Sequence, residues 1–236
     1  MKPRPVLITG AGRRAGLHLA RTFLARGQAV IGTFRTERPS LAELRESGAE
    51  LLRCDFNDER DVDSLMRNVR DRHSGLRAII HNASEWLAED RELPAAEVMR
   101  RMMQVHVTVP YQLNLELAPL LAAGDDAADI IHIGDYVSSR GSRKHIAYAA
   151  SKAAQDNLTL SFAARLAPRI KVNSIAPALL LFNEGDDDAY REKARSKSLL
   201  RREGGLAELQ HAVDYLMQSR YVTGRVLPLD GGRHIA

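Results

Sequence analysis

Tyr148 and Lys152 stand four residues apart in the segment YAASK at 148–152, a spacing that places both side chains on one face of a helix. Tyrosine ionises near pH ~10, and a neighbouring cation favours the phenolate, so such a pair can act as a general acid near neutrality. Asp135 adds a carboxylate thirteen residues earlier. These residue types are suited to handing a proton to a carbonyl or a related group, although the pair alone is also typical of a solvent-facing contact.

A glycine-rich segment, TGAGRRAG at 9–16, lies between an apolar run and an amphipathic one. Glycines at such a turn let backbone N–H groups approach a pyrophosphate at the start of a helix. The spacing departs from GxGxxG, so its position between a strand and a helix carries most of the signal. Arg14 is either a surface arginine or a cation that reaches across the phosphates towards the substrate. The cofactor contacts expected here are Gly10, Gly12, Arg13, Arg14 and Gly16.

The second apolar run ends in GTFRTE, where a dinucleotide fold contacts the adenosine ribose. An acidic residue there would bind the ribose hydroxyls of NAD, whereas an arginine accommodates the 2′-phosphate of NADP. Arg35 and Thr36 offer a guanidinium and a hydroxyl at this point, with Arg38 nearby. The sequence therefore predicts NADPH as the cofactor.

Short apolar runs alternate with longer amphipathic segments along the chain, which predicts a parallel sheet covered on both faces. The expected fold is α/β, a single Rossmann-type doubly wound parallel sheet of about seven strands with helices on both faces, in one domain over 1–236. The expected strands are 5–9, 29–34, 50–54, 76–81, 128–133, 169–175 and 226–229. The expected helices are 15–26, 39–47, 58–72, 95–122, 146–166 and 206–218.

Two weakly patterned stretches, 83–94 and 177–204, interrupt this alternation. Loops that follow the carboxyl ends of parallel strands form the ligand crevice, so 177–204 is the expected substrate loop. Its acidic run at 184–188 (EGDDD) is expected to be a solvated loop face, and no metal site is predicted.

Composition narrows the class of protein. Hydrophobic residues make up 44% and charged residues 27% of the 236 residues, and no apolar run approaches a membrane span. Cys54 is the one cysteine, which excludes an intrachain disulfide and is typical of a small core residue in a cytoplasmic protein. The net charge of +4 comes from basic residues scattered among acidic ones without interleaved aromatics, which argues against nucleic-acid binding and suits a phosphate-bearing cofactor.

Over essentially its full length the chain resembles the short-chain dehydrogenase/reductase family. The resemblance rests on TGAGRRAG, HNAS at 81–84, YAASK, VNSIAP at 172–177 and VTGRVLPLDGG at 222–232. It implies a homotetramer and further cofactor contacts at Asp55, Phe56, Asn82, Ala83, Tyr148, Lys152 and Pro177. It also implies that Lys152 lowers the pKa of Tyr148 and holds the nicotinamide ribose.

Two positions depart from the family's usual set. Asp135 replaces a serine, and His106 in MQVHV replaces an asparagine that supports a water relay. Pteridine reductases of this family also carry an arginine in the glycine loop and an aspartate at the serine position. HNASEW, HIGDYV and LFNEGDD resemble, within that branch, the bacterial dihydromonapterin reductases. His106 is either a buried hydrogen-bonded residue or a residue that organises water.

This resemblance implies NADPH-dependent reduction of a dihydropterin, with 7,8-dihydromonapterin as the expected substrate and dihydrofolate as a weaker one. A carboxylate at 135 suits the donor-rich edge of a pterin better than it suits a simple ketone. Trp86 is expected to stack on the pterin or, alternatively, to lie in the core or an interface. The substrate contacts expected are Arg14, Ser84, Trp86, Asp135 and Tyr148, with Tyr190 as a lesser candidate. A short-chain carbonyl reductase and a non-catalytic NADP-binding regulatory protein remain as alternatives.

Overall fold

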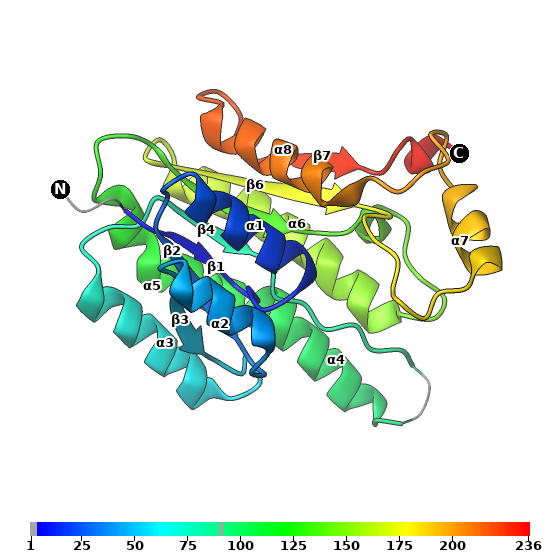
Figure 1. The fold of residues 1–236 in the computed structure, drawn as a ribbon, viewed down its shortest axis with the longest axis horizontal. Coiled ribbons are helices and arrows are strands. Elements are labelled where there is room, and N and C mark those ends of the chain that lie inside the picture. Colours follow the sequence, from blue (N-terminus) through cyan, green and yellow to red (C-terminus); the bar gives the residue numbers. More distant parts are fainter. Residues whose placement is uncertain (1–3, 90–91) are drawn as a thin grey trace.

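Seven parallel strands form one sheet in the order β3-β2-β1-β4-β5-β6-β7 (Figure 1). The structure is a computed structural model and describes residues 4–89 and 92–236. The strand order reverses at β1, and the predicted doubly wound sheet is thereby confirmed. The strands are β1 Val6–Ile8, β2 Val30–Phe34, β3 Glu50–Arg53, β4 Ala78–His81, β5 Ala128–Ile133, β6 Ile170–Pro177 and β7 Val226–Leu229.

Helices cover both faces of this sheet (Figure 1). They are α1 Arg14–Ala25, α2 Pro39–Glu46, α3 Glu59–Arg72, α4 Ala95–Met103, α5 Val109–Ala122, α6 Ile146–Leu166, α7 Asp188–Arg195 and α8 Gly205–Gln218. The side chains of a strand alternate between faces, so Leu7 packs among α3, α5 and α6, whereas Val6 and Ile8 pack among α1, α2 and α8. Because helices cover both faces of the sheet, residues on both sides of each strand are buried, and this explains why the strands are continuous apolar runs in the sequence.

The predicted helix at 95–122 contains a π-helical turn. Gln104–Thr108 separates α4 from α5 and carries His106. Pro110, two residues into the next turn, lacks the N–H that would bond to the His106 carbonyl in an α-helix. The amide Nε2 of Gln155, from α6, donates to that carbonyl at 3.2 Å. The predicted extent of this helical run is correct, but the contact of Gln155 that completes the π turn could not be predicted from the sequence.

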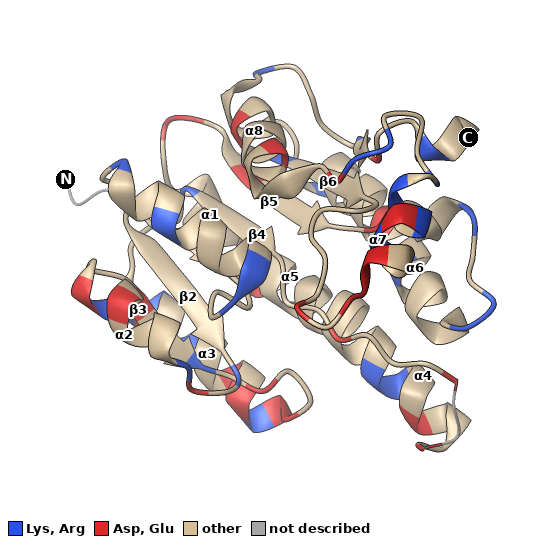
Figure 2. Cartoon of the chain, turned by 45° about the vertical axis from the view of Figure 1, so that its right-hand side comes forward, with Lys and Arg blue, Asp and Glu red and all other residues tan. Residues whose placement is uncertain are grey.

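The loop at 177–204, which the sequence predicts to be the substrate loop, contains a helix that was not predicted, α7. The carboxylate of Asp187 accepts from the backbone N–H of Tyr190 at 2.7 Å and so caps the start of α7. Asp186 accepts from the N–H of Asn183 at 2.8 Å. The acidic run leads directly into α7 on the surface, as Figure 2 shows, so these carboxylates act as turn and helix caps.

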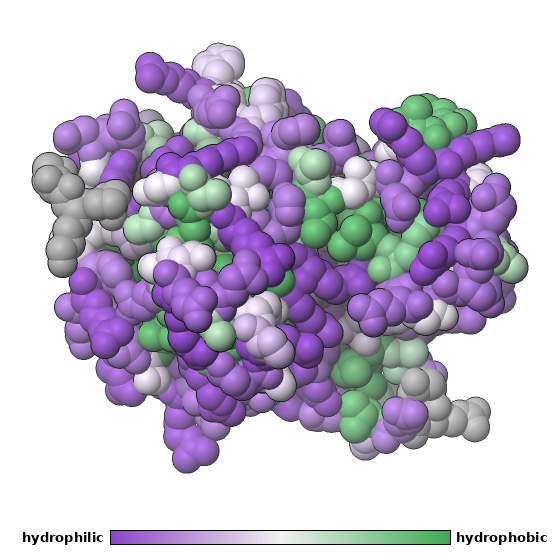
Figure 3. Space-filling view, viewed as in Figure 1, coloured by the Kyte–Doolittle hydropathy of each residue, from purple (hydrophilic) through white to green (hydrophobic). Residues whose placement is uncertain are grey.

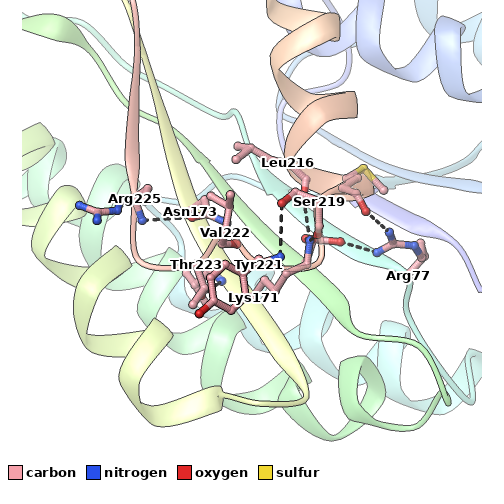
Figure 4. Close-up of polar contacts among 12 residues, drawn as sticks. Arg77, Lys171, Asn173, Leu216, Ser219, Tyr221, Val222, Thr223 and Arg225 are labelled. Carbon is pink, nitrogen blue, oxygen red and sulfur yellow. Dashed lines mark hydrogen bonds and ion pairs between the residues drawn. The ribbon is translucent and has the colours of Figure 1, made fainter.

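The amino ends and the carboxyl ends of the strands carry different polar groups. At the amino ends of the strands, Asp129 at the start of β5 is ion-paired with Arg77 and with Lys171, the second residue of β6. Figure 4 shows Arg77 and Lys171 reaching the end of α8, where the Lys171 ammonium donates to the carbonyls of Leu216 and Ser219, at 2.6 Å each. At the carboxyl ends, the loops open into a cleft.

Short 3-10 turns at Tyr136–Ser139 and Arg233–Ile235 complete the secondary structure. Within residues 4–89 and 92–236, each helix is too short or too polar to cross a membrane. In the space-filling view, apolar residues gather in a hollow between the regions of α1 and α7, on a face that is otherwise mostly hydrophilic (Figure 3).

Candidate active site

A cleft of about 690 Å³ lies at the carboxyl ends of the strands. It gathers residues that come from separate loops and elements, and every predicted site residue lines it except Gly16 and the lesser candidate Tyr190. Those residues are Gly10, Gly12, Arg13, Arg14, Arg35, Thr36, Asp55, Phe56, Asn82, Ala83, Ser84, Trp86, Asp135, Tyr148, Lys152 and Pro177. The residues predicted from separate motifs therefore share one site.

The glycine loop is held against the end of β4. The side-chain amide of Asn82 donates to the carbonyls of Thr9 and Gly10 at 3.0 and 3.1 Å. Gly10 adopts a left-handed φ of +70°, and a Cβ there would lie 3.0 Å from the Cα of Ala83. Gly16 does not line the cleft; a Cβ on it would lie 2.2 Å from the Gly10 carbonyl oxygen, so this glycine permits α1 to pack closely on the loop.

Four arginines crowd one end of the cleft. Burial lowers the pKa of Arg13, and the charges of Arg38, Arg14 and Arg35 lower it further. Like charges gathered in this way are stabilised by an anion, and Gly10 and Gly12 line the cleft beside them. The arrangement fits the phosphates of a dinucleotide, and Arg35 with Thr36 fits a 2′-phosphate.

Glu85 is the acidic group among these arginines, and the sequence reasoning did not single it out. Its carboxylate is 11% exposed and contacts Arg35 at 3.2 Å. The guanidinium of Arg101, from α4, pairs with the same carboxylate. Glu85 thus joins the predicted 2′-phosphate arginine to the wall of the cleft that follows β4.

Arg14 has a left-handed φ of +49°, a conformation that a side chain with a Cβ rarely adopts. Its guanidinium donates to the Asn183 side chain at 2.8 Å and to the Leu181 carbonyl at 3.3 Å. Arg14 therefore spans from the glycine loop to the substrate loop. Arg14 is thus hydrogen-bonded rather than free on the surface, and its contact with the substrate stays a prediction.

The acid and base groups meet at the end of β5. The Tyr148 hydroxyl donates to Oδ2 of Asp135 at 2.8 Å, and Oδ1 of Asp135 accepts from the N–H of Val137 at 2.9 Å. The Lys152 ammonium donates to the Ile133 carbonyl at 2.7 Å and to Oε1 of Gln155 at 3.3 Å. Asp135, Tyr148 and Lys152 are thus fixed together on the cleft wall.

The expected lowering of the Tyr148 pKa is wrong. Burial raises the pKa of Tyr148, and the negative charge of Asp135 raises it further. Burial also raises the pKa of Asp135, and it lowers the pKa of Lys152 to about 8. The carboxylate touches the phenol, whereas the Lys152 nitrogen lies 5.8 Å from the ring centroid, so the anion has the stronger effect. Tyr148 therefore remains a neutral phenol, which is the form that can donate a proton.

His106 is fully buried and hydrogen-bonded at both ring nitrogens. Nε2 lies 2.9 Å from the Ser84 hydroxyl, and Nδ1 lies 2.8 Å from the Ser151 hydroxyl. Burial, followed by the charge of Lys152, lowers the pKa of His106 well below its usual value. The imidazole is therefore neutral at physiological pH.

Trp86 lies at the mouth of the cleft and is 66% exposed, so it is not a core residue. One of its faces stacks on the imidazole of His145, with ring centroids 4.0 Å apart and planes inclined by 25°. Tyr190 does not line the cleft; it lies on α7 against the ring of Phe182. The structure thus brings Trp86 and Ser84 into the site and leaves Tyr190 outside it.

Cys54 is buried beside the adenosine end of the cleft as a free thiol, and burial raises its pKa to about 12. It is a small packed residue at a strand end, as expected. Among the residues that the structure describes, no cluster of three or more His, Cys, Asp or Glu side chains could hold a metal ion.

Comparison with known proteins places this site in a family. A family model described as Enoyl-(Acyl carrier protein) reductase matches residues 10–234. A protein of Klebsiella pneumoniae named dihydromonapterin reductase is 55% identical over 233 residues, covering 98% of this chain and 97% of the relative. The chain belongs to the short-chain dehydrogenase/reductase family. A dihydromonapterin reductase of Escherichia coli (strain K12) is 53% identical over 235 residues, 99% of this chain and 98% of the relative.

Solved structures agree with this placement in the short-chain dehydrogenase/reductase family. The alternative dihydrofolate reductase 1 (FolM) of Brucella suis, crystallised with NADP, is 30% identical and superposes with a TM-score of 0.86, covering 99% of this chain and 96% of that one. A Pseudomonas aeruginosa RhlG–NADP complex is 25% identical with a TM-score of 0.88, covering 98% of this chain and 96% of that one. The fold and the family predicted from the sequence are confirmed.

Proposed function

We propose that the protein is an NADPH-dependent reductase that converts 7,8-dihydromonapterin to its tetrahydro form, with weaker reduction of dihydrofolate. The observation that carries the proposal is the contact between Asp135 and Tyr148 inside the cleft. Relatives that share more than half of their residues with this chain are named for the same reaction. A solved relative named as an alternative dihydrofolate reductase was crystallised with NADP, which supports the cofactor.

The residues of the cleft fit an NADP cofactor. The glycine loop lines the cleft beside Arg13, and Arg35 with Thr36 offers a guanidinium and a hydroxyl for the 2′-phosphate. Two donors of Lys152 are fixed on Ile133 and Gln155, and the ammonium also lines the cleft, where it would bind the ribose hydroxyls. A bound NADPH supplies the hydride for reduction.

Tyr148 would provide the proton for the ring nitrogen of the C=N bond. Its phenol is held by Asp135 and kept protonated by burial and by the adjacent carboxylate. Proton donation from the Tyr148 oxygen leaves a phenolate, which solvent must reprotonate after each turnover. Two acceptor oxygens, those of Asp135 and Ser84, also face the cleft, and they match the N–H and amino groups on the edge of a pterin.

Trp86 would cover one face of the pterin. Its indole is exposed at the cleft mouth and is held by His145, so it is pre-oriented for stacking. We further propose that the chain acts as a single domain in a cytoplasmic homotetramer, for which the family resemblance is the support. Size-exclusion chromatography with light scattering tests the oligomeric state.

The decisive assay follows NADPH oxidation with 7,8-dihydromonapterin, dihydrofolate and a panel of ketones. The unsubstituted protein is expected to reduce the pterin fastest. Asp135→Ser should lower dihydropterin reduction by at least about tenfold, because a charged acceptor for a pterin N–H is replaced by a shorter, neutral hydroxyl, while ketone reduction stays level or rises. Faster turnover of a ketone than of the pterin by the unsubstituted protein would favour a carbonyl reductase, and an Asp135→Ser enzyme as active on the pterin as its parent would remove the role given to Asp135.

A further inference from the structure

His106 does not touch the cleft, yet it controls the direction of a hydroxyl group that does. It comes from the π-helical turn between α4 and α5 and is fully buried. It does not appear among the cleft-lining residues, whereas its partner Ser84 does. The hydrogen bonds around the imidazole determine which way the Ser84 proton points.

The proton on the imidazole can be assigned by following the hydroxyl groups. Ser151 has one hydroxyl proton, which it donates to the Tyr148 carbonyl at 2.7 Å. Ser151 must therefore accept from Nδ1 of His106, 2.8 Å away, so Nδ1 carries the imidazole proton. A neutral imidazole has only one proton, which leaves Nε2 bare.

The bare Nε2 of His106 must then accept the Ser84 proton across 2.9 Å. The Glu85 carbonyl is 3.4 Å away and competes poorly. The Tyr148 hydroxyl is a further polar neighbour of Ser84, and its own proton is donated to Asp135. With its proton turned into the protein, the Ser84 oxygen presents only lone pairs to the cleft. Ser84 is thus an acceptor and not a donor for whatever binds there.

We propose that His106 is a positioning residue that fixes Ser84 as a hydrogen-bond acceptor for an N–H group of the substrate. This inference rests on the proposed function, since a dihydropterin carries N–H and amino donors on its edge. A ketone oxygen would need a donor at the same place, so the His106–Ser84 pair favours the pterin class over simple ketones.

The test is a double-mutant cycle between His106 and Ser84. His106→Leu removes the acceptor for the Ser84 proton, and we expect the KM for 7,8-dihydromonapterin to rise about tenfold, with kcat and the NADPH dissociation constant within about twofold. Tenfold corresponds to about 1.4 kcal/mol, the scale of one hydrogen bond. In the Ser84→Ala background His106→Leu should add almost nothing, because the hydroxyl it directs is gone.

His106→Gln is the matched control, since its side-chain oxygen can occupy the place of Nε2 and should restore most of the lost affinity for the pterin. Equal effects of His106→Leu with and without the Ser84 hydroxyl, or a parallel loss of NADPH binding, would overturn the inference in favour of a merely structural histidine. An unsubstituted protein that fails to reduce the pterin would instead overturn the proposed function.

Nitrogen NMR of the labelled protein gives a readout that does not depend on turnover. The His106 ring is expected to show a protonated Nδ1 and a bare Nε2, and the Nε2 signal should shift in Ser84→Ala. A protonated Nε2 would contradict the assigned hydrogen-bond direction even if the enzyme is active.

Discussion

A carboxylate lies near each end of strand β5, Asp129 fully buried and Asp135 partly buried, and the two are held by different partners. Asp129, at the amino end, is in contact with two cations, Arg77 and Lys171. Asp135 lies two residues after the carboxyl end of β5 and, within residues 4–89 and 92–236, forms no ion pair; it is held by the Tyr148 hydroxyl and the Val137 N–H. The contrast separates two kinds of site, because Asp129 is held by ion pairs away from the cleft, whereas Asp135 lines the cleft and is influenced by the charges of Lys152 and Arg233 without an ion pair to either.

The cations at Asp129 also join other parts of the fold. Lys171 donates to the carbonyls of Leu216 and Ser219 at the end of α8, and Arg77 donates to the Met217 carbonyl at 3.0 Å (Figure 4). Positive charge at the carboxyl end of a helix also complements its dipole. Asp129 therefore balances a pair of cations that attach α8 to the sheet, a role that concerns stability.

The largest expected effect is on stability, from Asp129→Asn. The substitution leaves Arg77 and Lys171 without their counter-charge, so the free energy of unfolding should fall by about 3 kcal/mol, as for other broken buried pairs. Urea denaturation measures this change. The kcat of the remaining folded enzyme should match that of the parent, and a large loss of kcat would mean that the amino end of β5 is not separate from the chemistry.

Asp135→Asn is expected to do the reverse. It keeps the shape of the side chain but removes the charge that holds and orients Tyr148, so kcat/KM for 7,8-dihydromonapterin should fall by about a hundredfold, or about 2.7 kcal/mol. Unfolding stability at neutral pH should stay level or rise slightly, since burial disfavours the ionised carboxylate. A strong loss of stability with intact activity would reverse the roles assigned to the two carboxylates.

The change of kcat/KM with pH should be smaller than the effects of these substitutions, and it should reflect the titration of Lys152 and Asp135 at the carboxyl end of β5 but not that of Asp129. Lys152 has a pKa lowered to about 8, so it loses its charge above that pH and kcat/KM should decline on the alkaline side. The pKa of Asp135 is raised, so the carboxylate becomes protonated on the acid side at a higher pH than an ordinary aspartate, near ~3.9, would be. The acid limb should move or vanish in Asp135→Asn, while the same limb in Asp129→Asn should coincide with that of the parent.

Much of this arrangement could be predicted from the sequence, because the pattern of apolar residues determines the strands and the order of the motifs determines where they lie on the sheet. Continuous apolar runs predicted the buried parallel strands, and the order of the motifs placed Arg35, Asn82 and Tyr148 at one edge of the sheet. The pairing of Asp129 with Lys171 was hidden, since charged residues inside predicted strands give no hint of which partner lies across the sheet. Glu85 was also missed, because its partner Arg101 is sixteen residues away and no local pattern connects the two.

Local chemistry was harder to predict than topology. The spacing of Tyr148 and Lys152 suggested that the cation would set the tyrosine pKa, but the pKa depends on burial and on which charge is in contact. Likewise, Pro110 was visible in the sequence, yet the π turn that presents His106 also needs Gln155 from another helix. Such effects depend on tertiary distances that no local pattern encodes.

The six-residue interval between Asp129 and Asp135 has a consequence for how the enzyme can change. At about 3.3 Å per residue along a strand, the two carboxylates lie roughly 20 Å apart. Substitutions at sites separated by this much combine additively in most proteins. Laboratory evolution towards new substrates can therefore vary the residues around Asp135 without disturbing the ion pairs of Asp129, which attach α8 to the sheet and stabilise the fold.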